Sequence, residues 1–432
     1  MLDSKALTKI QSIILIAIVV VAAVCGAAYV FWDGPTQSSE TIKIGVCTDL
    51  GSGYGDATLQ GAIMATEQIN AKGGILGKQI ELIKEDTDFG STSFDPSSVS
   101  TAINRLITYD KVDFVIGGLA NDDNAIIQDS IAQHKKIFIS VSAPADYLTE
   151  RVLADYEKYK YFFKVAPPNS TALSFGYADS FVALREYTGF NKIAYLAMDF
   201  SVFDSGVQNI ESLAELYGFD LVYGERFPPG TIDFSSYFAQ IESSGAEILA
   251  GNMFGDESIA FIKEWYDRQS PVVIWGSNLA SSDFSFWEIT DGKCEYETVP
   301  SPAVMAGYPV TNYTLAVRNA YIDRWGAVPS PPATAAYDII RFILPNAIER
   351  AGSTETEAVL NALEEVDLKT STSQRFLFLD SHDVMYGPGY DVQYFFQWQD
   401  GKKVIIYPRE LKEEAGSLYM FPDWSGPWDD LD

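Results

Sequence analysis

Short apolar runs alternate with amphipathic stretches along most of the chain. In its first part, runs rich in β-branched residues predict buried strands, and the apolar positions between them recur at helical spacing. The predicted strands are residues 42–48, 78–84, 112–118 and 137–142, and the predicted helices are residues 57–71, 95–109 and 122–134. Because strands that alternate with helices form parallel sheets covered on both faces, the pattern predicts a doubly wound α/β lobe.

The same alternation starts again near residue 192. Strands are predicted at residues 192–198, 219–227, 247–254 and 271–276, with helices at residues 207–217, 233–243 and 257–268. Beyond residue 300 the pattern predicts three more helices and a β-hairpin, at residues 313–325, 334–351, 356–365 and 390–407. The predicted fold class is therefore α/β, with two doubly wound parallel-sheet lobes.

The N-terminus has the pattern of a membrane-spanning segment. An almost unbroken apolar run covers residues 13–32, and about 20 apolar residues are enough to cross a bilayer as a helix. Lys5 and Lys9 precede the run, so the positive side stays in the cytoplasm and the rest of the chain is expected outside. Residues 1–33 are therefore predicted to be a signal or membrane-anchor helix. Residues 34–40, with Gly, Pro, Thr, Gln and Ser, are typical of a short linker.

Several kinds of processing remain open for this segment. A cleaved secretory peptide is the main alternative to an anchor, although the apolar run is longer than the usual signal core. Lipid attachment at Cys25 is disfavoured by Val24, since lipoprotein signals place a small residue there. Residues 5–8, Lys-Ala-Leu-Thr, resemble the processing site of archaeal pilin-like signal peptides. Cleavage after Ala6 would leave the helix on the mature protein, and the resemblance indicates an archaeal source.

Composition narrows the range of partners. The 432 residues are 47% hydrophobic and 13% aromatic, enough to bury large cores in two or three lobes. The chain has 59 acidic against 30 basic residues, a formal net charge of −29, and that field repels nucleic-acid phosphates. Three cysteines cannot build a disulfide framework, and two histidines cannot build a His-rich metal site. Neither a nucleic-acid partner nor a metal is expected.

Catalytic motifs are missing from the sequence. It contains no G-x-S-x-G, H-E-x-x-H or C-x-x-C motif. Residues 73–78 lack the pattern of a phosphate-binding loop, and residues 51–55 lack the third glycine of a dinucleotide-binding fingerprint. His134 and His382 have no obvious nucleophile or metal partner in sequence. No catalytic residue and no cofactor are expected, although the glycine-rich residues 51–55 follow a strand, where open α/β sheets bind ligands.

Residues 42–77 resemble the opening of the substrate-binding proteins of branched-chain amino-acid ABC transporters, the Leu/Ile/Val-binding family of type I periplasmic binding proteins. The most specific part is G-x-x-x-A-x-x-x-I-N-x-x-G-G-I-x-G at residues 61–77. Residues 85–88 and 403–408 agree with it, so the resemblance spans about residues 41–408. It implies the type I periplasmic binding fold, in which two lobes are joined by three crossovers and the ligand binds in the cleft between them.

The resemblance also implies a division of the chain and a role for it. The first lobe would comprise residues 41–164 plus 300–388, and the second lobe residues 165–299 plus 389–432. The implied function is an extracytoplasmic solute-binding protein, anchored to the cell membrane by its N-terminal helix. Such a protein, expected to be a monomer, closes around a small polar molecule and delivers it to an ABC permease.

In the first lobe, the resemblance assigns cleft positions to Tyr54, Asn121, Asp122, Ser142 and Ala143. Where the family has a Ser and a Thr that hold the ligand carboxylate, this chain has Ala-Asn-Asp-Asp-Asn at residues 120–124. Two carboxylates at a helix N-terminus are well placed to cap it, and they would repel a ligand carboxylate if either faced the cleft. Residues 142–144, Ser-Ala-Pro, keep a hydroxyl in the next loop.

In the second lobe, the resemblance points to Phe203, Phe254 and Asn278. Phe203 and Phe254, the latter with Met253 as an alternative, would be aromatic walls of the cleft. Asn278 falls where the family has an acidic residue for the ligand ammonium, and an amide cannot neutralise that charge. Both halves of the α-amino-acid signature are altered. A neutral or cationic small ligand, such as an amide, a polyol or a nucleoside-like compound, is therefore expected more than leucine.

Two other functional classes remain open. The same fold serves as the ligand-sensing ectodomain of receptors, but such chains normally continue into a membrane-spanning output region, and this sequence ends at residues 428–432. A hydrolase on a similar α/β frame would need a nucleophile and a base, and the sequence names no such pair. A turnover assay separates a hydrolase from a binding protein, which returns its ligand unchanged.

Overall fold

The computed structural model describes residues 40–89, 96–200, 203–282, 284–387, 389–409 and 419–431, apart from the side chain of residue 205. The predicted membrane helix at residues 13–32 and its processing sites lie outside these ranges. Within them, no helix has both the length and the apolar character needed to cross a membrane. Residues 42–432 form a compact unit of their own, distinct from residues 1–41.

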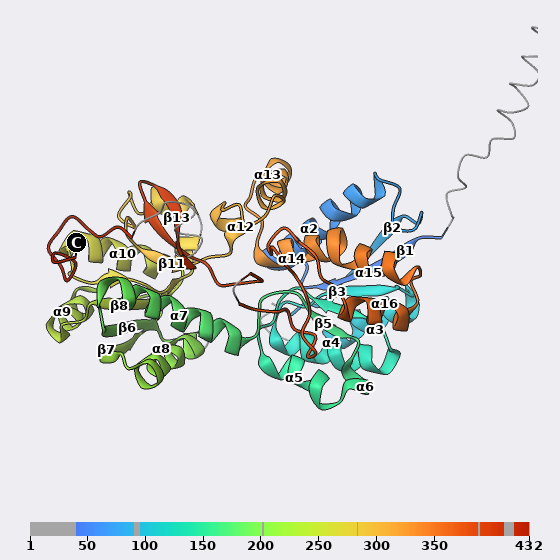
Figure 1. Cartoon of the computed structure of the whole chain (residues 1–432), viewed down its shortest axis with the longest axis horizontal. Helices are drawn as coiled ribbons and strands as arrows, with labels where there is room; N and C mark the ends of the chain where they lie inside the picture. The colour runs from blue at the N-terminus through green and yellow to red at the C-terminus, as the bar shows by residue number, and fades with distance from the viewer. Residues whose placement is uncertain are drawn as a thin grey trace, which may run out of the picture. The chain divides into compact units, whose positions relative to one another are not determined.

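The first sheet consists of five parallel strands, drawn in blue to green in Figure 1. In spatial order they are β2 (Ile80–Asp86), β1 (Ile42–Thr48), β3 (Phe114–Gly117), β4 (Phe138–Ser140) and β5 (Phe162–Lys164). The helices between them are α2 (Gly53–Asn70), α3 (Pro96–Asn104, followed by a π-helical turn, Arg105–Tyr109), α4 (Asn121–His134), α5 (Asp146–Ala154) and α6 (Tyr156–Tyr159). The chain thus alternates strand and helix through this sheet, as the periodicity predicts.

The second sheet is also parallel and contains the strands that follow residue 191. Its main path runs β10 (Ser277–Asn278), β8 (Ile248–Met253), β6 (Lys192–Met198) and β7 (Asp220–Phe227), and β9 (Val273–Ile274) pairs with β8. The helices that belong to this part are α7 (Ser170–Thr188), α8 (Asp204–Tyr217), α9 (Ser235–Ser244), α10 (Asp256–Arg268) and α11 (Ser285–Ile289), with a 3-10 turn at Ala280–Ser282.

A small antiparallel sheet and a group of helices complete the unit. The sheet pairs β11 (Thr298–Pro300) with β12 (Phe395–Gln399) and β12 with β13 (Lys402–Tyr407). The helices are α12 (Ala303–Ala306), α13 (Thr314–Trp325), α14 (Pro331–Asp338), α15 (Leu344–Ala351) and α16 (Thr356–Glu364), and a π-helical turn, Ile339–Ile343, joins α14 to α15. In Figure 1, α14, α15 and α16 lie beside the first sheet, although they follow the second sheet in sequence.

Two groups of buried apolar side chains show why the chain returns to the first sheet. One core joins residues 42–166 with residues 317–384, and the cores around the second sheet join residues 177–296 with residues 395–431. The chain therefore passes between the two sheets three times: between β5 and α7, between β11 and α13, and between Val384 and β12. Burial of this apolar area is the main force that holds each sheet to its helices.

One close contact anchors the returning helices to the first sheet. Helices α2 and α14 pack directly on each other, and Gly61 lies where their backbones meet. A Cβ atom at Gly61 would fall 2.0 Å from the carbonyl oxygen of Ala333, so a larger residue there would force the helices apart. Gly61 also opens the sequence pattern that identifies the family resemblance, and the contact gives that glycine a physical reason.

The α/β fold with parallel sheets is confirmed, and the departures are local. The strand predicted at residues 271–276 is only the two-residue β9, and the helix predicted at residues 334–351 starts earlier and contains a π-helical turn. Residues 303–310 share a small core with Tyr394, Phe396 and Ile405 of the hairpin. That packing is tertiary, so no local periodicity announces it.

A buried ion pair joins two of the three connections. The Lys164 ammonium at the end of β5 lies 3.0 Å from the Asp383 carboxylate, and both side chains are almost completely buried. Lys164 Nζ also donates to the carbonyl of Pro167, and Val384 N–H donates to Asp383. Burial lowers the pKa of Lys164 and raises the pKa of Asp383, because each charge has lost its water. The pair holds the first connection against the third.

Removing one partner of this pair should be costly. Lys164→Met leaves the Asp383 carboxylate buried without a counter-charge, and we expect the free energy of unfolding to fall by about 3–5 kcal/mol. The double variant Lys164→Met/Asp383→Asn buries no charge and should recover most of that loss. Urea denaturation of the three proteins at pH 7 measures both effects. Equal stability of the wild type and Lys164→Met would contradict the assignment.

Candidate functional site

The loop after β1 presents Tyr54 on the surface. Ser52 caps α2 by accepting a hydrogen bond from the N–H of Gly55 at 3.0 Å. A Cβ atom at Gly55 would fall 1.8 Å from the carbonyl oxygen of Asp49, so the tight turn requires glycine there. Tyr54, in the first turn of α2, remains 60% exposed. The loop thus holds an aromatic ring at the carboxyl end of the first strand.

The acidic segment at the start of α4 acts mainly as a cap. Asp123 is buried and accepts hydrogen bonds from the N–H groups of Leu119 and Ala120, at 2.9 and 3.0 Å. Burial raises the pKa of the Asp123 carboxyl to about 6, although these donors favour its charged form. Asp122 is exposed. The capping expected of these carboxylates is therefore performed by Asp123, one residue beyond the predicted cleft residue Asp122.

Asn121 and the residues after β4 lie on neighbouring loops. The Asn121 side-chain oxygen accepts a hydrogen bond from the N–H of Ala145 at 3.1 Å, which ties the α4 N-terminus to the loop that contains Ser142. Ser142 is half-buried and Ala143 is fully buried, with a φ of 94°. The structure therefore brings Asn121 and the Ser142 loop together, but the Ala143 side chain belongs to the core.

Three phenylalanines gather at the carboxyl ends of β6 and β8. Phe254 follows β8, and its ring lies 5.7 Å from the ring of Phe203 and 5.6 Å from the ring of Phe200. Phe203 is 4% exposed and belongs to the core, whereas Phe200 is about half exposed. The predicted pair Phe203 and Phe254 is thus in contact. Phe200, which the sequence argument missed, is the most exposed ring of the three.

Asn278 lies below the surface in a buried polar network. Its side chain is 2% exposed, and its amide donates to the carboxylate of Glu297 at 2.8 Å. Ser281 donates to the other oxygen of Glu297, also at 2.8 Å. Burial raises the pKa of Glu297 to about 7, with Lys403 acting in the opposite direction. The acidic group near this position is therefore supplied by Glu297, and Asn278 holds it in place.

A cavity lies where the connections between the two sheets run, and we refer to it as the crossover cavity. Its volume is about 610 Å³. Residues 165–168, 300–305 and 391–394 line it, together with Tyr54 and the 277–282 segment. Residues of both sheets' structural units therefore meet around one concave, partly open space, and concave sites of this kind are the usual setting of a small-molecule site. Of the predicted cleft residues only Tyr54 lines it.

Sequence reasoning missed most of this cavity. The connecting segments that form its walls have no periodicity, and their clearest signal is proline, at Pro167, Pro168, Pro300 and Pro302. Prolines fix φ and remove donors, so they mark rigid irregular segments without indicating what those segments enclose.

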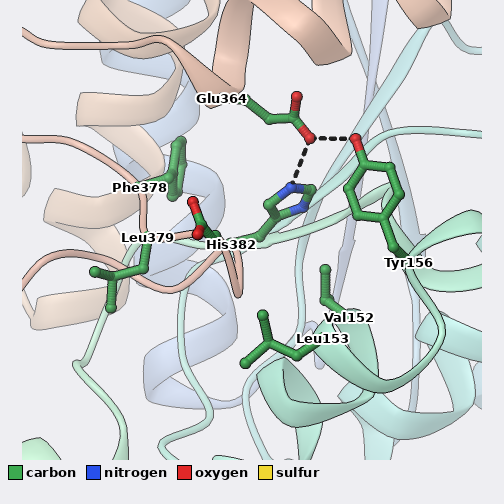
Figure 2. Close-up of a pocket in the computed structure, with 8 residues that line it drawn as sticks. Val152, Leu153, Tyr156, Glu364, Phe378, Leu379 and His382 are labelled. Carbon is green, nitrogen blue, oxygen red and sulfur yellow. Dashed lines mark hydrogen bonds and ion pairs between the residues drawn. The ribbon is translucent and has the colours of Figure 1, made fainter.

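A second cavity of about 340 Å³ surrounds His382 and is shown in Figure 2. His382 is buried, stacks on Phe163 at a ring distance of 4.0 Å, and has its two ring nitrogens 3.0 Å from the carbonyl of Phe162 and the carboxylate of Glu364. Tyr156 also donates to Glu364 (Figure 2). No Ser, Thr or Cys is among the described residues that line this cavity. The His–Glu pair connects α16 to the third connection.

The Glu364 contacts should make stability depend on pH. The hydrogen bond from His382 lowers the pKa of Glu364 below its unfolded value, so the carboxylate stabilises the fold above about pH 4.5, and this contribution disappears as the pH falls through the folded pKa. At pH 7 we expect Glu364→Gln to lose about 1–2 kcal/mol relative to the wild type. Thermal unfolding between pH 3 and 7 should show the difference shrinking towards low pH.

Glu365→Gln is the matched control. Glu365 is largely exposed and pairs with Arg350 at the surface, so its removal should cost less than Glu364→Gln at every pH. A Glu364→Gln deficit that stays constant from pH 7 to pH 3 would contradict the role given to the carboxylate.

The chain belongs to the periplasmic binding protein family, whose model matches residues 41–403. The family assignment from the sequence is thereby confirmed. The match covers both parallel sheets and all three connections and ends at the start of β13.

Relatives and solved structures agree with this assignment. The Leu/Ile/Val-binding protein homolog 7 of Brucella suis is 25% identical over 418 residues, which cover 91% of this chain and 96% of that protein. The ABC transporter substrate-binding protein of Sphaerobacter thermophilus has a TM-score of 0.66 at 22% identity and covers 85% of this chain and 96% of its own. The branched-chain amino acid transporter substrate binding protein of Streptococcus pneumoniae, in complex with isoleucine, has a TM-score of 0.63 at 21% identity, with coverages of 85% and 100%. These structures share the fold of this chain.

Proposed function

We propose that this protein is the extracytoplasmic solute-binding component of an ABC importer. It binds a small polar molecule, an amino acid, an amide or a related compound, and releases it unchanged to a permease. The observation that carries the proposal is the crossover cavity, because its walls come from both sheets' units and from all three connections in a chain of the periplasmic binding protein family. Such a space can be closed by moving one sheet's unit against the other.

In the proposed mechanism the two lobes are residues 41–164 plus 300–388 and residues 165–299 plus 389–432. A ligand that touches both lobes favours the closed arrangement only by its difference in contact energy between the open and closed states. Turning a mostly open population into a mostly closed one takes about 5 kcal/mol of such difference. Tyr54, which lines the cavity, would contact the ligand from the first lobe. Asn121, Ser142 and Phe254 do not line it, and they would reach the ligand only in the closed arrangement.

Tyr54 offers a direct test of ligand contact. The purified protein is titrated by calorimetry with amino acids, amides, sugars and nucleosides, and the compound that binds is recovered and shown to be unchanged. Tyr54→Ala should weaken its affinity about tenfold, because it removes an aromatic wall. Tyr109→Ala is the control, since Tyr109 is also exposed and does not line the cavity. Failure of every compound, or equal affinity in both variants, would count against the proposal.

We further propose that residues 13–32 anchor a monomer to the outer face of the cell membrane. The apolar run and the lysines before it support this topology. In a membrane fractionation, the full chain should sediment with membranes and be degraded by protease added outside the cell. A variant with Val19→Asp and Val20→Asp, which interrupts the run, should lose membrane retention. Retention of that variant would argue for another means of attachment.

A further inference from the structure

The crossover cavity has an acidic group in its wall and no basic one. Among the described residues that line it, Asp391 is the only one with a carboxyl group, and no lysine, arginine or histidine is present. The remaining polar groups are hydroxyls and one amide, and the rest of the wall is apolar. A ligand carboxylate would therefore meet a carboxylate and find no cation.

The surroundings of Asp391 also favour a positively charged ligand over a negatively charged one. Its carboxylate accepts a hydrogen bond from the N–H of Val392, and the carboxylates of Asp338 and Asp383 act on it as like charges. Asp338 is buried and accepts hydrogen bonds from the Ser371 N–H and the Thr372 hydroxyl, and Asp383 is already paired with Lys164. Burial and these like charges raise the pKa of Asp391 to about 7, and Tyr386 and Tyr394 are the other ionisable groups beside it. A cation brought by a ligand would relieve both costs.

The starts of α14 and α7, two of the helices at the cavity, do not supply an anion site. Helix α14 begins with Pro331 and Pro332, which have no N–H, and Ser330 caps the N–H of Ala333. At the start of α7, the N–H groups of Ser170 and Thr171 donate to Pro144 and Asp146. The donors that usually hold a ligand carboxylate at a helix start are therefore missing or already used. Helix α12 also begins at the wall, but it is a single turn.

The rest of the cavity lining suits the apolar part of a ligand. Phe376, Tyr394, Val304, Met305 and Leu279 line the same space with the prolines of the connections. The volume of about 610 Å³ accommodates a ligand with an aromatic ring or a branched alkyl group. The net charge of −29 also draws cations towards the protein in preference to anions.

We propose that the crossover cavity binds an organic cation, a primary amine with an apolar body, whose ammonium pairs with the Asp391 carboxylate. This inference rests on the proposed solute-binding function and names the class of solute. The ammonium charge lies at the third connection, and the apolar body lies against Phe376 and the proline segments.

Three small molecules of similar shape and different charge test whether the cavity prefers a cation. Calorimetric titrations of the full chain at pH 7.5 use phenethylamine, 2-phenylethanol and 3-phenylpropanoate, which are a cation, a neutral molecule and an anion. We expect phenethylamine to bind at least tenfold more tightly than the alcohol, and the carboxylate not to bind. Lowering the pH to 5.5 should weaken the binding of the amine and leave the affinity for the alcohol unchanged, since Asp391 then becomes protonated.

Two variants locate the effect. Asp391→Asn should bring the ratio of amine to alcohol affinity close to one. Asp380→Asn should keep the wild-type ratio, because Asp380 is exposed and does not line the crossover cavity. If Asp391→Asn does not fold, the wild-type comparison of the three probes decides the inference alone.

The outcomes distinguish this inference from the proposed function. Equal affinity for amine and alcohol, binding of the carboxylate, or an unchanged ratio in Asp391→Asn would overturn the cation preference. Solute binding would still stand if another compound bound and Tyr54→Ala weakened it. If neither the probes nor the amino acids, amides, sugars and nucleosides bound, both the inference and the proposed function would fail.

Discussion

Parallel strand pairing is the constraint on which the rest of this structure depends. Because neighbouring strands run in the same direction, the loops after β1, β3 and β4 emerge at one edge of the first sheet, and those after β6, β8 and β10 emerge at one edge of the second. Residues that are 70 or more positions apart, such as Tyr54 and Ser142, are thereby brought to one edge. The helices that cover the faces leave this edge as the place where polar groups and exposed rings can gather.

The three connections consist of irregular backbone, and side-chain contacts and prolines help to fix their geometry. The starts of the first and third connections are tied together by the buried pair of Lys164 and Asp383 and by the stacking of His382 on Phe163, and prolines limit the torsions of the first and second connections. A buried charge pair adds little net stability over apolar residues, but it penalises every arrangement in which its partners separate. The connections are consequently held in a defined geometry, and bending is confined to the few residues outside these contacts.

The sequence predicted the strands and most helices because their signal is local. The strands at residues 42–48 and 192–198 match β1 and β6, since most of the apolar side chains of these runs are buried there. The candidate site was harder to predict. Asn278 looked like a ligand contact by its position, yet Glu297, 19 residues further on, draws its amide into the core. The Asp391 carboxylate and the proline walls meet only after the chain has crossed three times, and no periodicity encodes that meeting.

The location of the crossover cavity determines how a bound ligand would affect the connections between the two sheets. Where two sites of a protein are far apart, coupling between them is carried by chains of packed side chains and hydrogen bonds. Here the segments at residues 165–168, 300–305 and 391–394 line the cavity and also belong to the connections between the two sheets, which would bend if the proposed closure takes place. A molecule seated there would restrict the backbone torsions of the joint itself. Binding of the ligand would then directly fix the orientation of one proposed lobe relative to the other, and no intervening side chains would be needed to transmit the effect.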